Sequence, residues 1–223
     1  SAQNGSVTSP QALSNPFDPN VTIGHDDFIH APFLDDVITD TATGAANVLR
    51  GGEGSDTITY SRMGASTVEG GEGNDLIRVD SYLPAGPTYV HYLTGGVGND
   101  RFEAGNNTEI YRFSRGDGLD TINDNDTGGG AIDKIVLGAG IVPSDIAVTR
   151  SGNHLVLRIN GPDNPGVFDR ITIENWHQTQ QRIERVEFAD GTVWTSANLS
   201  ALSMMGTEGA DLLTLWSDTG TAD

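Results

Sequence analysis

Large apolar residues recur in this chain at fixed offsets from glycine-rich segments. Between residues 49 and 123, an apolar side chain follows each segment at the same offset, and a second one precedes it by two residues. The following residues are Ile58, Ile77, Phe102 and Ile122, and the preceding ones are Leu49, Val68, Leu93 and Phe113. An isolated inward position in a polar triplet is typical of a very short strand. The pattern therefore predicts two facing ladders of parallel strands with a thin core between them.

The glycine-rich segments themselves form a repeat of nine residues, G-G-x-G-x-D-x-U-x, where U is apolar. The four blocks are GGEGSDTIT (51–59), GGEGNDLIR (70–78), GGVGNDRFE (95–103) and RGDGLDTIN (115–123), the last with arginine in place of the first glycine. Their first residues are 19, 25 and 20 positions apart, which corresponds to about two nonapeptides per coil. Such periodicity is typical of a parallel β-helix that binds calcium. We therefore predict an all-β fold in which residues 22–127 form a parallel β-roll, a right-handed solenoid of nonapeptide repeats.

The register can be extended upstream to a first coil without the glycines. Asp36 and Ile38 occupy the aspartate and apolar positions of residues 31–39, and Ile29 precedes that block by two residues. We interpret residues 22–39 as a degenerate first coil.

The aspartates of the blocks would form a column along one edge of the roll. Stacked coils lie about 4.8 Å apart, and like charges at that distance repel by roughly 3.5 kcal/mol at an effective dielectric constant of about 20. A divalent cation between neighbouring carboxylates removes this repulsion. Ca²⁺ accepts 6–8 oxygen ligands in flexible geometry, whereas Zn²⁺ prefers Cys and His and Mg²⁺ requires a tighter octahedron. The spacing therefore predicts Ca²⁺. The alternative, that these aspartates only form turns, does not explain why they repeat in phase with both ladders.

We expect calcium between Asp56 and Asp75, between Asp75 and Asp100, and between Asp100 and Asp120, with a further site between Asp36 and Asp56. The turns would add oxygen ligands from Gly51, Glu53, Gly54, Gly70, Glu72, Gly73, Gly95, Val97, Gly98, Asp117 and Gly118. The corresponding positions of the opposite turns are Asn47, Ser66, His91 and Tyr111. None of these four residues is acidic, so we expect calcium on one edge only.

Residues 128–204 lose the nonapeptide and show hairpin signals instead. Strands are expected at 134–137, 146–150, 155–159, 170–173, 182–188 and 192–194, followed by a short helix that is capped by Thr195 or Ser196 and reaches Met204. We interpret this part as a small, mostly antiparallel β capping domain, whose Trp176 and Trp194 close the open end of the roll. Residues 1–21 would form a loose N-terminal arm. A new repeat begins at Gly206, so residues 205–223 are expected to start a further array in a larger protein.

Charge and composition restrict the function classes. The chain carries 31 acidic and 12 basic residues, a formal net charge of −19, which opposes binding to nucleic acid and to anionic membranes. Cysteine is absent, which excludes disulfides and thiolate sites. No apolar run is long enough to span a membrane, and no signal peptide precedes the repeats. No H-E-x-x-H or G-x-S-x-G motif occurs, so we expect no enzymatic activity.

The blocks resemble the repeats of the RTX (repeats-in-toxin) family of secreted bacterial proteins. The later segments FSRGDGLDTINDND (113–126), IENW (173–176) and IERVEFADGTVW (183–194) look like the domain that follows these repeats in haemolysin-type calcium-binding proteins. The resemblance implies a secreted protein that is exported by type I secretion machinery and that folds on meeting extracellular calcium. A second interpretation is a module that binds an alginate-type polysaccharide, attached to an enzyme or adhesin. Arg78 and Arg101 would then form a cationic patch on neighbouring coils.

Overall fold

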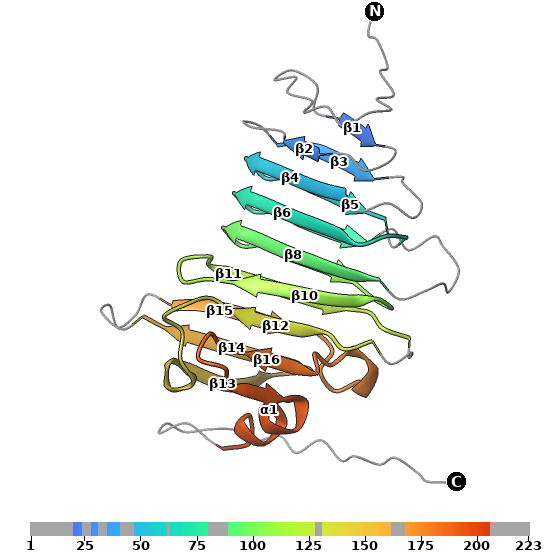
Figure 1. Ribbon diagram of the computed structural model, residues 1–223. Coiled ribbons are helices and arrows are strands. Elements are labelled where there is room, and N and C mark those ends of the chain that lie inside the picture. The colour runs from blue at the N-terminus through green and yellow to red at the C-terminus, as the bar shows by residue number, and fades with distance from the viewer. Residues whose placement is uncertain are drawn as a thin grey trace, which may run out of the picture.

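The protein is all-β, with one short helix near its C-terminal end (Figure 1). The computed structural model describes residues 20–23, 28–30, 35–40, 47–61, 63–79, 89–127, 131–161 and 168–205. One sheet has nine strands in the order β1 (Asn20–Ile23), β3 (Val37–Asp40), β5 (Thr57–Tyr60), β7 (Leu76–Val79), β9 (Arg101–Ala104), β11 (Leu119–Asp124), β15 (Phe168–Ile173), β14 (His154–Asn160) and β13 (Ile146–Ser151). The other has eight strands in the order β17 (Val193–Thr195), β16 (Arg185–Glu187), β12 (Lys134–Leu137), β10 (Thr108–Phe113), β8 (Val90–Val97), β6 (Ser66–Glu72), β4 (Asn47–Glu53) and β2 (Phe28–His30).

Strands that follow one another in the sequence alternate between the two sheets. From β1 to β11, each strand pairs in parallel with the strand two places along the chain, so every pair of strands adds one layer to both sheets. Figure 1 shows these layers stacked from the N-terminus towards the C-terminus. The degenerate first coil follows the same rule, because Ile38 pairs with Ile58 and Ile29 pairs with Leu49.

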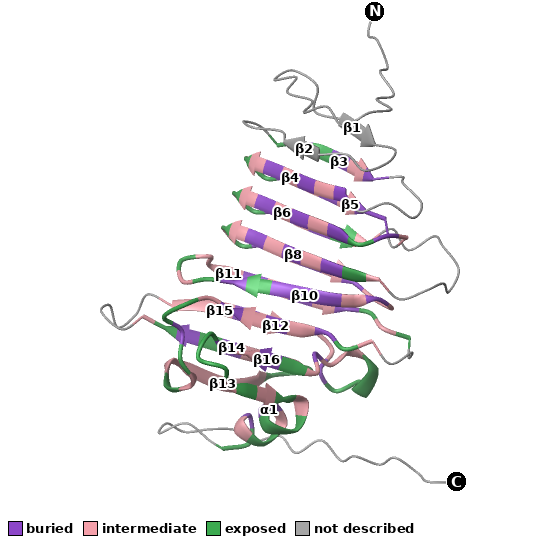
Figure 2. Ribbon diagram, viewed as in Figure 1, coloured by how far each residue is buried: buried purple, intermediate pink, exposed green. Residues whose placement is uncertain are grey.

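The core lies between the sheets and consists of the two apolar ladders. The first ladder contains the residues expected from the repeat: Ile38, Ile58, Ile77, Phe102 and Ile122 are fully buried and continue to Ile173. In the second ladder, Leu49, Val68 and Leu93 are followed by Tyr111, Ile135 and Val186. Buried and less buried residues alternate along these strands, as side chains on opposite faces require (Figure 2).

The expected position of Phe113 in the second ladder was wrong. Tyr111 pairs with Leu93, whereas Phe113 lies one inward position further along and pairs with Leu137. The pairs Arg112–Thr94 and Thr121–Arg101 show that the fourth coil has two more residues in its turn than the third. Both aromatic side chains are buried, because a shift of two residues along a strand keeps the same face.

Glycine is required where the turns of successive coils meet. Gly54 donates its N–H to the carbonyl oxygen of Glu72 at 2.8 Å. Gly73 has a φ of +128°, and a methyl group on it would lie 1.9 Å from the carbonyl oxygen of Gly54. A side chain at this position would force the coils apart, so the close stacking of the turns depends on glycine.

The C-terminal part continues both sheets, and the pairings among its own strands are mostly antiparallel. The predicted hairpin strands are present as β12 to β17, and α1 (Ser196–Leu202) is capped by the Thr195 side chain, which accepts the N–H of Asn198. Parallel pairing of β12 with β10, of β16 with β12 and of β15 with β11 extends the two ladders, whereas β13–β14–β15 and β16–β17 are antiparallel. Two 3-10 turns, Pro143–Asp145 and Thr179–Gln181, connect these strands.

The C-terminal strands cover the end of the apolar ladders. Trp176 is fully buried in the core, and Trp194 packs against that core while partly exposed. Both tryptophans therefore contribute apolar contacts to the core.

Two sequence-based expectations lie outside the described residues, namely most of the N-terminal arm and the repeat that begins at Gly206. Within the described residues, no helix is both long and apolar enough to cross a membrane.

Candidate metal centre

The predicted aspartate column exists at one edge of the two sheets. Four of the aspartates directly precede their strands, and the fifth is the second residue of β11; all five are buried, namely Asp36, Asp56, Asp75, Asp100 and Asp120. Each of the last four accepts the backbone N–H of the preceding member through Oδ1, at 2.7, 2.8, 2.8 and 2.9 Å. The structure therefore brings together the carboxylates that the repeat predicted, one in each coil. The column ends at Asp120, because the residue that pairs with it on the next strand is Ile171.

One oxygen of each of three central carboxylates has no hydrogen-bond partner. These atoms are Oδ2 of Asp56, Asp75 and Asp100, and each is buried. Buried carboxylate oxygens are normally satisfied, so three unpartnered oxygens in the same position of three coils indicate a place where a ligand fits. They are the atoms that would coordinate an ion.

The orphan oxygens face the first glycine of their own block. A methyl group on Gly51 would lie 2.0 Å from Oδ2 of Asp56 and 2.6 Å from the carbonyl oxygen of Gly70 in the next coil. A methyl group on Gly70 would meet Asp75 Oδ2 at 2.1 Å and the Gly95 carbonyl at 2.6 Å. Carboxylate and carbonyl oxygens thus converge from two coils in the space that glycine leaves open. This donor set consists only of oxygen and fits Ca²⁺.

Other predicted turn ligands could reach an ion only through their backbone oxygens. The side chains of Glu53, Glu72 and Val97 are exposed and do not enter the column. The carbonyl oxygens of Glu72 and Val97 accept the N–H groups of Gly54 and Gly73, each at 2.8 Å. A carbonyl oxygen has a second lone pair, so these contacts leave one coordination position on each.

The fourth turn differs from the other three. The Asp117 carboxylate accepts the N–H of Ser114 at 2.7 Å, which closes the longer turn locally. Asp169 accepts the N–H groups of Gly116 and Gly118 at 3.0 and 3.1 Å. Asp169 was not among the predicted site residues, and only the stacking of β15 on β11 brings it to this turn.

A second polar column, which the sequence interpretation missed, lies beside the aspartates. The side chains of Asp35, Ser55, Asn74 and Asn99 each accept the backbone N–H of the corresponding residue in the next coil, at 2.7, 3.1, 2.7 and 3.0 Å. The available signal was a short polar residue before each aspartate of the column except Asp120, which follows Leu119. These bonds hold neighbouring turns in register without using the orphan oxygens.

Burial changes the acid-base properties of the column. Desolvation raises the pKa of Asp56 and of Asp100 to about 7, that of Asp75 to about 6 and that of Asp120 to about 8. The hydrogen bond from the preceding backbone lowers each pKa, and for Asp56, Asp100 and Asp120 the neighbouring carboxylates raise it further. In the absence of a cation, the column therefore retains protons near neutral pH. A bound cation would displace them.

The opposite edge does not match the expected set of neutral residues. Asn47, Ser66 and His91 occupy the predicted position, but the next residue in that register is Glu109, since Glu109 pairs with His91. Tyr111 was wrongly assigned for the same reason as Phe113, because the extra residues of the fourth coil lie after both of them. This edge therefore contains a buried carboxylate.

The two arginines of the expected cationic patch are not neighbours in register. Arg78 pairs with Glu103, and Arg101 pairs with Leu76. Arg101 is bound by Glu174 at 2.9 Å and by Glu103 at 2.9 Å. Its charge is thus neutralised within the protein.

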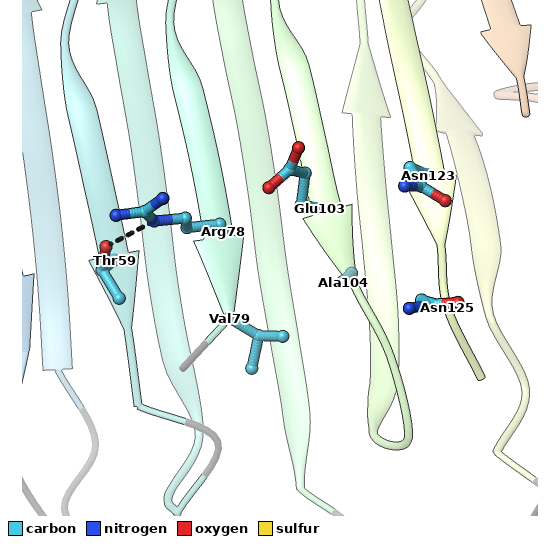
Figure 3. Close-up of a pocket in the computed structure, with 7 residues that line it drawn as sticks. All are labelled: Thr59, Arg78, Val79, Glu103, Ala104, Asn123 and Asn125. Carbon is cyan, nitrogen blue, oxygen red and sulfur yellow. Dashed lines mark hydrogen bonds between the residues drawn. The ribbon is translucent and has the colours of Figure 1, made fainter. Parts of the chain in front are cut away.

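Arg78 lies in a surface depression that runs across β5, β7, β9 and β11. The depression has a volume of about 450 Å³ and is lined by Thr59, Arg78, Val79, Glu103, Ala104, Asn123 and Asn125 (Figure 3). Arg78 donates to the Thr59 hydroxyl at 3.1 Å, as the dashed line in Figure 3 shows. The lining has three uncharged polar side chains, one cation, one carboxylate and two apolar side chains.

Known proteins resemble two parts of the chain. A segment of 107 residues is 32% identical to the iron-regulated protein FrpA of Neisseria meningitidis serogroup C, and this covers 46% of the chain and 9% of FrpA. The chain thus spans less than a tenth of the length of this relative. Residues 154–198, which contain β14 to β17, match the haemolysin-type calcium binding protein related domain.

Proposed function

We propose that this chain is a calcium-binding RTX-type module, in which Ca²⁺ ions lie between successive coils of a parallel β-roll along the aspartate edge. The observation that carries the proposal is the set of orphan oxygens on Asp56, Asp75 and Asp100, each facing a glycine turn. The match of residues 154–198 to a haemolysin-type calcium-binding related domain supports the same chemistry. The activity is binding and folding, not catalysis.

Calcium would act as part of the fold. Five carboxylates stacked in one buried column destabilise the folded state when they are ionised, and each ion shared between two coils would remove that repulsion. At a concentration of about 100 times the dissociation constant, each bound ligand stabilises the folded state by about 2.7 kcal/mol. Extracellular modules bind Ca²⁺ with dissociation constants of about 10⁻⁴ to 10⁻³ M. Three sites can therefore switch a marginally stable chain from unfolded to folded at millimolar calcium.

The proposed domain organisation follows from this role. Residues 22–127 form the calcium-dependent roll, residues 128–204 close its C-terminal end, residues 1–21 precede it and residues 205–223 begin another array. In the RTX interpretation the chain is a segment of a larger secreted protein that leaves the cell unfolded through type I secretion machinery. Such a chain would stay unfolded in a calcium-poor cytosol and would fold in calcium-rich surroundings.

Circular dichroism with a calcium titration tests the proposal. The chain is first treated with EDTA, and calcium is then added up to 10 mM while the β signal and the unfolding temperature are recorded. We expect a gain of β signal, a higher unfolding temperature and a binding stoichiometry of at least three ions by calorimetry. A chain with the same signal and the same unfolding temperature in EDTA and in calcium would contradict the proposal. Magnesium at the same concentration is the control, and we expect a much smaller effect because of its stricter geometry.

A second candidate function is the binding of an acidic polysaccharide of the alginate type. The observation that favours it is the polar depression around Arg78, where asparagine and threonine side chains could bind hydroxyl groups (Figure 3). The net charge of −19 opposes a polyanion, and Arg101 is already paired. Calorimetry with alginate oligosaccharides, using Arg78→Gln as the matched variant, distinguishes this function from a purely structural role.

A further inference from the structure

Three buried carboxylates converge at the edge opposite the aspartate column. Glu109 is the second residue of β10, Asp124 is the last residue of β11, and Asp133 directly precedes β12. One carboxylate oxygen from each lies within 4.8 Å of the other two. Their exposed fractions are 0%, 2% and 2%. We call these three residues the inner acidic cluster.

Two oxygens of the inner acidic cluster have no hydrogen-bond partner. They are Oε2 of Glu109 and Oδ1 of Asp124, and both are inaccessible to solvent. None of the ion pairs among the described residues involves a member of the cluster. Buried carboxylates are normally paired with cations or fully hydrogen-bonded. Here both kinds of compensation are incomplete.

The other oxygens of the cluster are held in place by neighbouring groups. The hydroxyl of Tyr111 donates to Oδ2 of Asp124 at 3.1 Å, and that of Tyr60 donates to Oε1 of Glu109 at 3.4 Å. Oδ1 of Asp133 accepts the backbone N–H of Glu109 at 2.7 Å. Each carboxylate is thus oriented through one oxygen, and Glu109 and Asp124 each keep the other oxygen free.

The edge repeats the geometry of the aspartate column. The Glu109 N–H donates to the Asp133 side chain, and the Asp133 N–H donates to Oε2 of Glu184 at 2.8 Å. In the aspartate column, each backbone N–H likewise donates to the carboxylate of the next coil. The opposite edge therefore has a carboxylate ladder of its own, formed by Glu109, Asp133 and Glu184, which begins in the coil where the aspartate column ends. It has no G-G-x-G turn.

We propose that the inner acidic cluster is a second type of cation site, which takes a hard divalent ion such as Ca²⁺ through oxygens of Glu109, Asp124 and Asp133. The site lies where β10, β11 and β12 join the repeat coils to the C-terminal strands, so an ion here would bind the two parts of the chain together. It goes beyond the proposed function, because it uses none of the repeat aspartates and none of the glycine turns.

The competing occupant is the proton. Burial and the neighbouring carboxylates raise the pKa of Glu109 and Asp124 well above the ordinary range, and burial raises the pKa of Asp133 to about 7. In the folded chain without a cation, burial and the neighbouring charges therefore favour protons on Glu109 and Asp124. A cation would replace those protons and accept the two free oxygens as ligands.

The double variant Glu109→Gln/Asp124→Asn tests whether a cation or only protons occupy the cluster. Both substitutions keep the size of the side chain and mimic the protonated acids, so folding in EDTA should be unchanged or improved. If the cluster binds an ion, native mass spectrometry of the full chain in calcium shows one ion fewer than in the unsubstituted chain. The control Glu69→Gln/Glu187→Gln removes the same formal charge from carboxylates that pair with Arg50 and Lys134, and it should bind the full number of ions. An unchanged number in the cluster variant overturns the inference.

The proposed sites on the aspartate edge are tested separately by Asp75→Asn. A loss of ions in Asp75→Asn without a loss in the cluster variant would overturn only the inference made here. The reverse result would overturn only the proposed function.

Terbium luminescence gives a readout that does not depend on substituting a ligand. Tb³⁺ at the cluster would lie beside the Tyr60 and Tyr111 rings, so excitation of tyrosine should sensitise its emission. We expect Tyr60→Phe/Tyr111→Phe to lose most of the emission, whereas Tyr92→Phe, which removes a half-buried tyrosine outside the cluster, should keep it. Equal emission from the two variants would overturn the inference.

Discussion

The backbone N–H of Asp56 donates to Oδ1 of Asp75 at 2.8 Å, while Oδ2 of Asp75 has no hydrogen-bond partner. One oxygen thus fixes the register between two coils, and the other is available to a cation. The same division of roles occurs at Asp100, which accepts the Asp75 N–H through Oδ1 and leaves Oδ2 free. Within one carboxylate, Oδ1 therefore holds neighbouring coils together, and Oδ2 remains available to bind an ion.

Asp75→Asn should reduce the response to calcium more than it reduces folding. The amide keeps an oxygen that can accept the Asp56 N–H, but it removes the charge that two proposed sites share. At saturating calcium we expect the calcium-dependent stabilisation to fall by up to about 5 kcal/mol, from two sites at about 2.7 kcal/mol each. The measurement is the unfolding temperature in 10 mM calcium and in EDTA.

Asp190→Asn is the matched control, because this carboxylate lies in an exposed turn and accepts the N–H of Thr192 at 2.8 Å. An equal calcium response in the two variants would contradict a role for Asp75 in binding.

In the absence of calcium, lowering the pH should stabilise the folded state. The pKa values of Asp56, Asp75 and Asp100 rise from 3.8 to about 7, 6 and 7 in the folded state, which means that folding without calcium binds protons. This contribution is fully present below about pH 4 and is lost as the pH rises through 6 to 8. In EDTA, we expect the unfolding temperature to fall on the order of 10 °C between pH 5 and pH 8.5. The inner acidic cluster would act in the same direction.

In saturating calcium the trend should reverse, because protons compete with the ion at low pH. Thermal unfolding followed by circular dichroism at several pH values, with and without calcium, checks both directions. Stability in EDTA that rises with pH over this interval would show that the column is ionised in the folded protein.

Gly73→Ala should destabilise the stack of turns in both metal states. The added methyl group would lie 1.9 Å from the Gly54 carbonyl oxygen, at a φ of +128° that alanine rarely adopts. We expect a loss of about 3 kcal/mol or more in the free energy of unfolding. Urea unfolding in calcium measures it.

The control for this substitution is Gly152→Ala, at the tip of the β13–β14 hairpin. Gly152 also has a positive φ, of +59°, but nothing lies within 4 Å of an added methyl group. We expect a loss of only about 1–2 kcal/mol there. If the two variants lost the same amount, the contact between turns would not be the cause.

Arg101→Ala should have a small effect on stability. The guanidinium binds both carboxylate oxygens of Glu174, at 3.2 and 2.9 Å, and so joins β9 to the C-terminal part of the chain. The groups are partly exposed, so we expect a loss of about 0.5–1 kcal/mol that decreases at high salt. Urea unfolding at 0.05 and 1 M salt, with Arg101→Lys to retain the charge without the paired contact, measures it. A loss that does not depend on salt would indicate packing instead of charge.

The sequence by itself determined the aspartate edge and the first apolar ladder. Asp56, Asp75, Asp100 and Asp120 recur at one position of the nonapeptide, and a strand with one inward side chain per triplet has only one way to bury Ile58 and Ile77. The C-terminal strands and α1 were also predictable, because hairpin residues and a Thr195 cap act locally.

Tertiary structure decided the register of the fourth coil and everything that depends on it. Tyr111 and Phe113 both face inward, so the apolar pattern is the same for either register, and only the pairing of β10 with β8 and β12 selects between them. That choice places Glu109 beside Asp124 and Asp133, from three different strands or their ends. A nonapeptide pattern describes one edge of a coil, whereas a cluster assembled across three separate segments depends on how the coils are stacked.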